Sequence, residues 1–171
     1  METTTNKSAG LIGLGAMGAG IAATLRRAGY HLHVCDARRE AAAAFARDGG
    51  TAHDSPAQVA AQCDTLVSVV VNAQQTEEVL FGANGAAGAM KPGSVFIMCS
   101  TVDPNWSIAL EKRLGDLGIH YIDAPISGGA AKAASGQMTV MSSARPEAYA
   151  QAGGVLDAMA GKVYRLGDRA G

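Results

Sequence analysis

The stretch GLIGLGAMGAG, Gly10 to Gly20, decides the fold of this chain, because its glycines separate a strand-like apolar run from a segment with helical apolar spacing. Before the pattern, the short apolar run from Ala9 to Leu14 predicts a buried strand. After it, the apolar spacing from Met17 to Ala28 predicts a helix, with Arg26 and Arg27 placed favourably near its end. The sequence therefore predicts a strand and a helix that are joined by a glycine-rich turn.

The turn has the pattern G-x-G-x-x-G, formed by Gly13, Gly15 and Gly18. Gly13 permits a tight turn, Gly15 leaves room for a diphosphate beside the backbone, and Gly18 lets the helix pack closely on the strand. Free N–H groups at the helix start, together with the helix dipole, would bind that diphosphate. The motif alone is a weak signal in a chain with 22 glycines, but its position between strand and helix indicates a dinucleotide site. The alternative is a glycine-rich turn without a ligand.

An acidic residue strengthens this interpretation. Asp36 closes the next predicted strand, 18 residues after Gly18, close to the expected spacing of about 20. We expect its carboxylate to accept hydrogen bonds from the adenosine ribose hydroxyls and to repel a 2′-phosphate, which favours NAD over NADP. Arg38 and Arg39 leave the alternative open, since an arginine just beyond this strand can hold the NADP phosphate; otherwise they are solvated residues at a helix start.

Outside this motif, apolar runs and helix-stop signals predict strands that alternate with helices. Further strands are expected at residues 30–36, 64–72, 94–99, 120–124, 138–141 and 162–166. Further helices are expected at residues 39–50, 73–81, 103–118 and 146–159, with a short helix opening at Ser55 and Pro56. This alternation predicts an α/β fold of Rossmann type with a doubly wound, mostly parallel sheet.

The composition narrows the class of protein. A length of 171 residues suits one domain, and a net charge of −1 with scattered basic residues gives no face for nucleic acid. The three cysteines are odd in number, lie in apolar segments and lack CxxC spacing, so we expect reduced thiols, a cytoplasmic location and no metal site. Lys7 before an apolar run raises the alternative of a secretory signal, but no A-x-A-like cleavage site follows, and the run is too short to span a membrane.

Three segments taken in order, GLIGLGAMGAGIA, CSTVDP and DAPISGGAAKAASGQMTVM, resemble the β-hydroxyacid dehydrogenase family. The resemblance covers nearly the whole chain beyond its polar N-terminal tail. It implies a nicotinamide-dependent oxidation of a small hydroxy acid. It also implies a polar tail at residues 1–8, a dinucleotide-binding domain at 9–166 and the start of an inter-domain segment at 167–171.

The resemblance also assigns site residues. It implies that the glycine turn and Asp36 hold the adenosine half of the cofactor; the turn comprises Gly13, Leu14, Gly15, Ala16, Met17 and Gly18. It also implies that Val71, Asn72 and Thr101 line the rest of the cofactor cleft. Ser127, Gly128 and Gly129 match a loop whose hydroxyl and amides hold the substrate carboxylate and a neighbouring oxygen. Each residue also follows a predicted strand, where open α/β sheets bind ligands. From the residues alone, an ordinary turn at 127–129 stays an equal alternative.

One expected feature of the family is missing from the printed sequence. The family's catalytic lysine, with a nearby asparagine, lies on a helix after the segment equivalent to GDRAG, which here ends at Gly171. The resemblance therefore implies the cofactor-binding half without an all-helical second domain, and we expect it to bind NAD but to turn over poorly. Self-association to a homo-oligomer is a further expectation. The alternatives are another activity within the family and a non-catalytic module that binds NAD or NADP.

Overall fold

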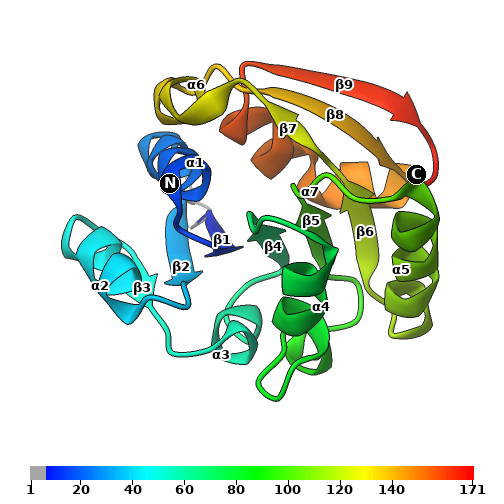
Figure 1. Cartoon of the computed structure of the whole chain (residues 1–171), viewed down its shortest axis with the longest axis horizontal. Helices are drawn as coiled ribbons and strands as arrows, with labels where there is room; N and C mark the ends of the chain where they lie inside the picture. The colour runs from blue at the N-terminus through cyan, green and yellow to red at the C-terminus, as the bar shows by residue number, and fades with distance from the viewer. Residues whose placement is uncertain (1–6) are drawn as a thin grey trace, which may run out of the picture.

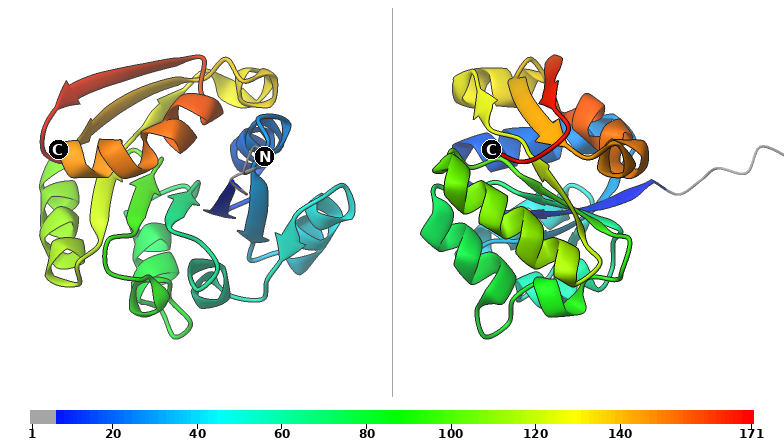
Figure 2. Two further views of the ribbon diagram at one scale, coloured as in Figure 1. Left: turned by 180° about the vertical axis from the view of Figure 1, so that it is seen from behind. Right: turned by 90° about the vertical axis from the view of Figure 1, so that its right-hand side faces the viewer.

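A single sheet runs through the chain, with helices on both of its faces (Figure 1, Figure 2). The computed structural model describes residues 7–171. Its strands are β1 (Ser8–Ile12), β2 (His31–Cys35), β3 (Thr51–Ala52), β4 (Thr65–Ser68), β5 (Val95–Met98), β6 (His120–Asp123), β7 (Ile126–Ser127), β8 (Thr139–Ala144) and β9 (Lys162–Gly167). The first six are parallel in the order β3-β2-β1-β4-β5-β6, which is the doubly wound order of Rossmann folds. The predicted fold class is therefore confirmed.

The sheet continues beyond β6 with strands of mixed direction. β8 pairs antiparallel with β6 and with β7, and β9 then pairs parallel with β8. Figure 1 shows β7, β8 and β9 above the parallel part, close to α6. The sheet is thus mostly parallel, as predicted, with an added mixed edge.

The helices begin where the sequence supplies caps. They are α1 (Ala16–Arg27), α2 (Arg39–Arg47), α3 (Pro56–Ala60), α4 (Ala73–Phe81), α5 (Pro104–Asp116), α6 (Gly129–Ser135) and α7 (Pro146–Met159), with a 3-10 turn at Ala87–Ala89. Asp103 Oδ1 accepts from the N–H groups of Asn105 and Trp106, and Ser55 Oγ accepts from Gln58 N, so two predicted helix starts are confirmed. Within residues 7–171, no helix combines the length and the apolar character needed to cross a membrane.

Two hydrophobic cores lie on opposite faces of the sheet. One packs α1, α2, α6 and α7, and the other packs α3, α4 and α5, with Phe96 fully buried in the second. Small residues allow close approach between elements. A Cβ atom at Gly20 of α1 would lie 2.6 Å from the Ala134 nitrogen of α6, so this helix pair requires the glycine.

Several predicted boundaries are wrong. The strands predicted at 9–14 and 64–72 end at Ile12 and Ser68, because the residues that follow turn away to form the cleft described below. The strand predicted at 138–141 instead runs to Ala144, and Ser127 forms β7 rather than a loop. Helix α6 was not predicted, since seven residues of alanine and polar side chains carry little periodicity.

The burial difference between two leucines gives a test of the fold. Leu66 in β4 is 0% exposed and Leu166 in β9 is 69% exposed. We expect Leu66→Ala to lower the free energy of unfolding by about 2–5 kcal/mol, because it leaves a cavity, and Leu166→Ala to change it by less than about 0.5 kcal/mol. Urea unfolding of both variants checks this, and equal losses would contradict the assignment of β4 to the core.

Candidate functional site

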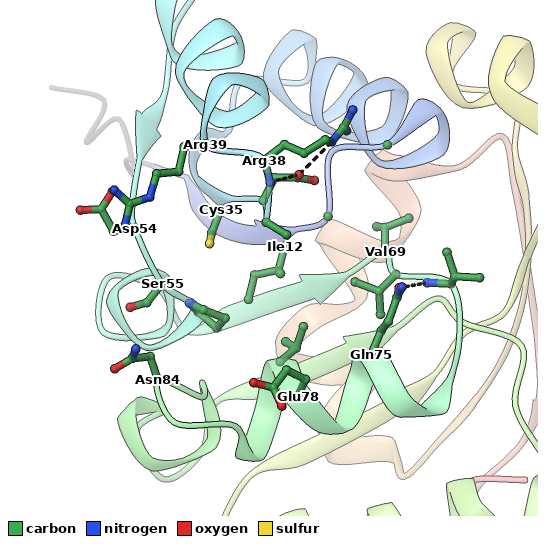
Figure 3. A pocket seen from close by; sticks show the side chains of 18 of the residues that line it. Ile12, Cys35, Arg38, Arg39, Asp54, Ser55, Val69, Gln75, Glu78 and Asn84 are labelled. Atoms are coloured by element: carbon green, nitrogen blue, oxygen red, sulfur yellow. Dashed lines mark hydrogen bonds and ion pairs between the residues drawn. The ribbon is translucent and has the colours of Figure 1, made fainter.

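The main cleft opens at the carboxyl ends of β1, β2 and β4, where the strand order reverses direction. It has a volume of about 590 Å³, and Figure 3 shows the side chains around it. Ile12, Cys35 and Val69 mark the strand ends at its base. Open α/β sheets bind ligands at this topological switch point. The cleft therefore lies where the glycine turn predicted a ligand site.

Two residues of the glycine turn lie where there is no room for a side chain. Gly13 has φ of +99°, and a Cβ atom there would collide with the Val69 carbonyl. A Cβ atom at Gly18 would collide with the Gly13 carbonyl, so the first turn of α1 lies directly on the strand-to-helix turn. Gly15 differs, since a Cβ atom there would meet nothing within 4 Å and Gly15 lines the cleft.

The N-terminus of α1 supplies the donors of the site. The first helical hydrogen bond runs from Ala19 N–H to the Gly15 carbonyl at 2.8 Å. The N–H groups of Ala16, Met17 and Gly18 precede it and belong to the helix end, where the dipole favours an anion. The side chain of Leu14 is buried in the core, so Leu14 contributes its backbone to the turn.

Asp36 is bound to the glycine turn in this structure. Its Oδ2 accepts from Leu14 N–H at 2.6 Å, and its Oδ1 accepts from Arg38 N–H at 2.8 Å and from Arg38 Nε at 3.3 Å. Arg38 Nη2 also donates to the Leu14 carbonyl at 3.2 Å. The acidic residue and the turn thus form one hydrogen-bonded unit at the cleft rim.

Three donors stabilise the ionised form of Asp36. Burial alone would raise the pKa of this carboxyl, but the backbone amides of Leu14 and Arg38 and the Arg38 guanidinium outweigh it and lower the pKa below its usual value. The side chain of Asp36 is only 10% exposed. The cleft therefore holds a fixed negative charge where the sequence predicted a ribose contact.

The next wall of the cleft is the loop between β4 and α4. Asn72 caps α4 by accepting from Gln75 N–H at 2.9 Å, and Gln75 Oε1 in turn accepts from Val71 N–H at 2.8 Å. Val71 and Gln75 both line the cleft, and Val71 is 77% exposed there. Asn72 itself is not among the residues that line the cleft, and its cap of α4 holds this loop in place.

Thr101 is exposed and follows β5, outside the residues that line the cleft. Its neighbour Ser100 donates from Oγ to the Val70 carbonyl at 2.7 Å and lies 3.4 Å from Thr76 Oγ1. These two buried hydroxyls connect the loop after β5 to the loop after β4. Thr101 is therefore held beside the cleft through its neighbour.

Ser127, Gly128 and Gly129 are exposed, and they also lie outside the cleft lining. Gly128 has φ of +137° and caps α6, which packs on α1. Thr24 Oγ1 of α1 donates to the Ala133 carbonyl at 2.9 Å, and Arg27 Nη2 donates to the Ala134 carbonyl at 2.6 Å. The structure thus joins the helix after the 127–129 segment to the helix that carries the glycine turn.

The far wall of the cleft is made of residues that sequence reasoning missed. It comes from the start of α3, from α4 and from the turn after α4, with Asp54, Ser55, Pro56, Glu78 and Asn84. Asn84 O accepts from Ala57 N–H at 3.0 Å, which ties this turn to α3. The capping pair Ser55-Pro56 was the available signal, since it fixes where α3 begins.

His53 has a partner that the sequence did not reveal. Its Nε2 lies 2.9 Å from His33 Nδ1 of β2, so one ring donates and the other accepts. Burial is the main cause that lowers the pKa of both imidazoles. The neutral pair fastens the segment that leads into the Asp54–Ser55 wall.

Comparison with known proteins agrees with this geometry. Residues 8–167 match the model of the NAD binding domain of 6-phosphogluconate dehydrogenase. An L-threonate dehydrogenase of Cupriavidus necator is 55% identical over 95% of this chain and 54% of its own length. A solved 3-hydroxyisobutyrate dehydrogenase of Salmonella typhimurium superposes with a TM-score of 0.92 at 40% identity, over 96% of this chain and 57% of that one. Psf3, solved in complex with NADP+ and 2-OPP, superposes with a TM-score of 0.88 at 25% identity, over 94% and 57%. The chain spans about half the length of these relatives.

The lowered pKa of Asp36 predicts how stability depends on pH. A carboxyl whose pKa is depressed by folding stabilises the protein above its unfolded pKa of about 3.9, and this contribution is lost as the pH falls through the folded pKa. We therefore expect Asp36→Asn to be less stable than the wild type at neutral pH, with a gap that narrows as the pH falls below about 4. Urea unfolding at several pH values measures the gap, and Asp157→Asn on the exposed face of α7 controls for net charge. A gap that did not change with pH would contradict the charge interaction.

Proposed function

Because this chain belongs to the β-hydroxyacid dehydrogenase family as an NAD-binding domain, we propose that it is the cofactor-binding half of an enzyme that oxidises a small hydroxy acid. One observation carries the proposal: the glycine turn, the N-terminus of α1 and the ionised Asp36 meet at the cleft between β1, β2 and β4. L-threonate is the substrate we favour, since the L-threonate dehydrogenase relative is 55% identical.

The adenosine half of the cofactor would occupy the cleft. The amides of Ala16, Met17 and Gly18 suit the diphosphate, because they sit at the positive end of α1. Asp36 suits the ribose, since a carboxylate offers acceptor positions beyond those that Leu14 and Arg38 use. The missing side chain of Gly15 leaves the space that a diphosphate needs.

The nicotinamide half would extend past Val71 and Asn72 toward Thr101 and Ser127. When bound, NAD supplies the acceptor for the hydride that leaves the carbinol carbon of the substrate. The protein's part is to orient the ring and the substrate. The Ser127 hydroxyl and the amides of Gly128 and Gly129 stand at the start of α6 and are accessible to an anionic carboxylate.

Related activities are the second candidate within this function. The Salmonella structure is a 3-hydroxyisobutyrate dehydrogenase. Oxidation of 3-hydroxyisobutyrate and reduction of tartronate semialdehyde are therefore the alternative activities. A non-catalytic module that binds NAD or NADP is the alternative of another class. We further propose a cytoplasmic location, supported by three buried, free cysteines. We also propose self-association through the exposed Met141 of β8 and Tyr164 of β9.

The glycine turn gives the test of cofactor binding. We expect Gly15→Ala to weaken NAD binding about tenfold or more, because the added methyl occupies diphosphate space, without lowering the midpoint of thermal unfolding. Gly88→Ala is the matched control, since a Cβ atom there also meets open space but lies away from the cleft. Calorimetric titration with NAD measures both. If the wild-type chain did not bind NAD, the proposed function would be wrong.

The 127–129 segment gives the test of substrate binding. We expect Ser127→Ala to weaken binding of L-threonate to the NADH-saturated chain about tenfold, because a hydrogen bond to a charged group contributes about 1.5–3 kcal/mol. Ser135→Ala, on an exposed serine at the other end of α6, should leave the affinity unchanged. Calorimetry measures the affinities, and 3-hydroxyisobutyrate titrated in parallel separates the two candidate substrates. Equal effects of the two serine variants would contradict the assigned role of Ser127.

A further inference from the structure

After β9, the chain crosses back from the edge of the sheet to α5. Gly167, the last residue of β9, pairs with Ser143 of β8, and four residues later Gly171 N–H donates to Asp123 Oδ2 of β6 at 3.0 Å. Figure 1 and the left view of Figure 2 both place the end of the chain beside α5. Residues 168–171, called the crossing segment, lie outside any helix or strand.

Glu111 of α5 binds the middle of the crossing segment. Its Oε2 accepts from Ala170 N–H at 2.8 Å, and its Oε1 accepts from Arg169 Nε at 3.3 Å. The Glu111 side chain is only 10% exposed, whereas that of Arg169 is 65% exposed. An ion pair with an exposed arginine contributes little, so the hydrogen bond from the Ala170 amide to the carboxylate is the main tie.

Asp123 binds the end of the crossing segment and a buried hydroxyl with the same oxygen. Its Oδ2 accepts from Gly171 N–H and, at 2.7 Å, from Ser107 Oγ of α5. Ser107 Oγ also lies 2.8 Å from the Tyr121 hydroxyl of β6. Ser107 and Glu111 are four residues apart, so they lie on the same face of α5. One face of this helix therefore holds the crossing segment, directly at Glu111 and through Asp123 at Ser107.

Packing adds to these hydrogen bonds. Ala170 is only 7% exposed and belongs to the second hydrophobic core, although its neighbours on both sides are exposed. A Cβ atom at Gly171 would lie 2.8 Å from Ile108 Cγ1 and 3.0 Å from the Pro104 carbonyl oxygen, so the segment contacts α5 closely. The crossing segment is thus an irregular stretch of backbone that side chains of α5 and β6 hold in one position.

The same aspartate lies where the chain leaves β6. Asp123 is the last residue of β6, and Ala124 N–H then donates to the Met98 carbonyl of β5 at 2.9 Å. Ser127 follows Asp123 by four residues, which span at most about 14 Å. A carboxylate that is held from two sides keeps the end of β6 in place, and the chain runs to Ser127 from that fixed point. The crossing segment and the 127–129 segment therefore share Asp123 as a common support.

We propose that Asp123 and Glu111 are positioning residues: they bind the crossing segment to α5, and the crossing segment in turn holds the end of β6 and the 127–129 segment in the geometry that the substrate requires. This inference rests on the proposed function, because the 127–129 segment is its substrate loop. Neither carboxylate lines the cofactor cleft, so their effect falls on substrate binding and not on NAD binding.

Amide hydrogen exchange of the ligand-free chain, measured by NMR at single residues, tests the support directly. We expect Glu111→Ala to speed exchange at Ala170 about tenfold or more, because its acceptor is lost. Exchange should also rise about threefold or more at Ala124 and at Met141, whose N–H donates to the Pro125 carbonyl. Amides of β1 and β4 should keep their rates.

Two further variants control this experiment. Glu111→Gln retains an oxygen that accepts from Ala170 N–H and should restore most of the protection. Asp116→Ala removes a carboxylate from the same helix, but one that is exposed and pairs with Lys112, and should leave all of these rates unchanged.

Calorimetry then measures the consequence for the proposed function. We expect Glu111→Ala to weaken binding of L-threonate to the NADH-saturated chain about threefold or more, and to change NAD affinity less than about twofold. Glu111→Gln should recover most of the L-threonate affinity. A general loss of stability would not produce this split between substrate and cofactor.

The outcomes separate this inference from the proposed function. Unchanged exchange at Ala170 in Glu111→Ala would overturn the anchor, and unchanged exchange at Ala124 and Met141 would overturn its link to β6. Faster exchange throughout the chain, or an equal effect of Asp116→Ala, would contradict a positioning role. Unchanged L-threonate affinity would overturn the effect on the substrate. A wild-type chain that did not bind NAD would overturn the proposed function, whereas the exchange rates would still decide whether the carboxylates support the end of β6.

Discussion

At Gly13 the turn after β1 lies against the Val69 carbonyl on one side and the first turn of α1 on the other, leaving no room for a Cβ atom. The cleft depends on this contact. It brings the N-terminus of α1 to the carboxyl ends of β1 and β4, and it thereby fixes the position of the α1 N–H groups relative to the sheet. The positive φ of Gly13 and the close approach at Gly18 are two requirements of one geometry, because either side chain would push α1 away from the strands.

The sequence predicted the elements whose physics is local. The alternation of strands and helices predicted a doubly wound, mostly parallel sheet, and the starts of α3 and α5 followed from Ser55 and Asp103 with the prolines after them. What it could not predict was set by distant contacts. Helix α6 is stabilised by packing on α1 rather than by its own seven residues, and the His33–His53 pair joins β2 to the segment that follows β3, 20 residues further along the chain.

The same distinction applies to the site. The spacing from Gly18 to Asp36 identified the acidic residue, since the motif is local to one strand–helix–strand unit. The spacing could not distinguish Arg38 from Arg39. In the structure Arg38 donates to the Leu14 carbonyl, whereas Figure 3 shows Arg39 on the side of Asp54, and folding alone brings these neighbours together. The sequence likewise did not predict that Gln75 lines the cleft, because its side chain is placed there by the hydrogen bond from Val71 N–H.

The packing of α1 on α6 connects the two halves of the proposed site. The glycine turn stands at the N-terminus of α1, and Ser127, Gly128 and Gly129 stand at the N-terminus of α6. Gly20 lets the two helices approach until backbone atoms limit them, and Thr24 and Arg27 bind the α6 carbonyls. Because protein interiors are closely packed, a shift of one helix must move the other. The distance between the glycine turn and the 127–129 segment, which we propose as the cofactor and substrate loops, is therefore set by the packing of α1 on α6.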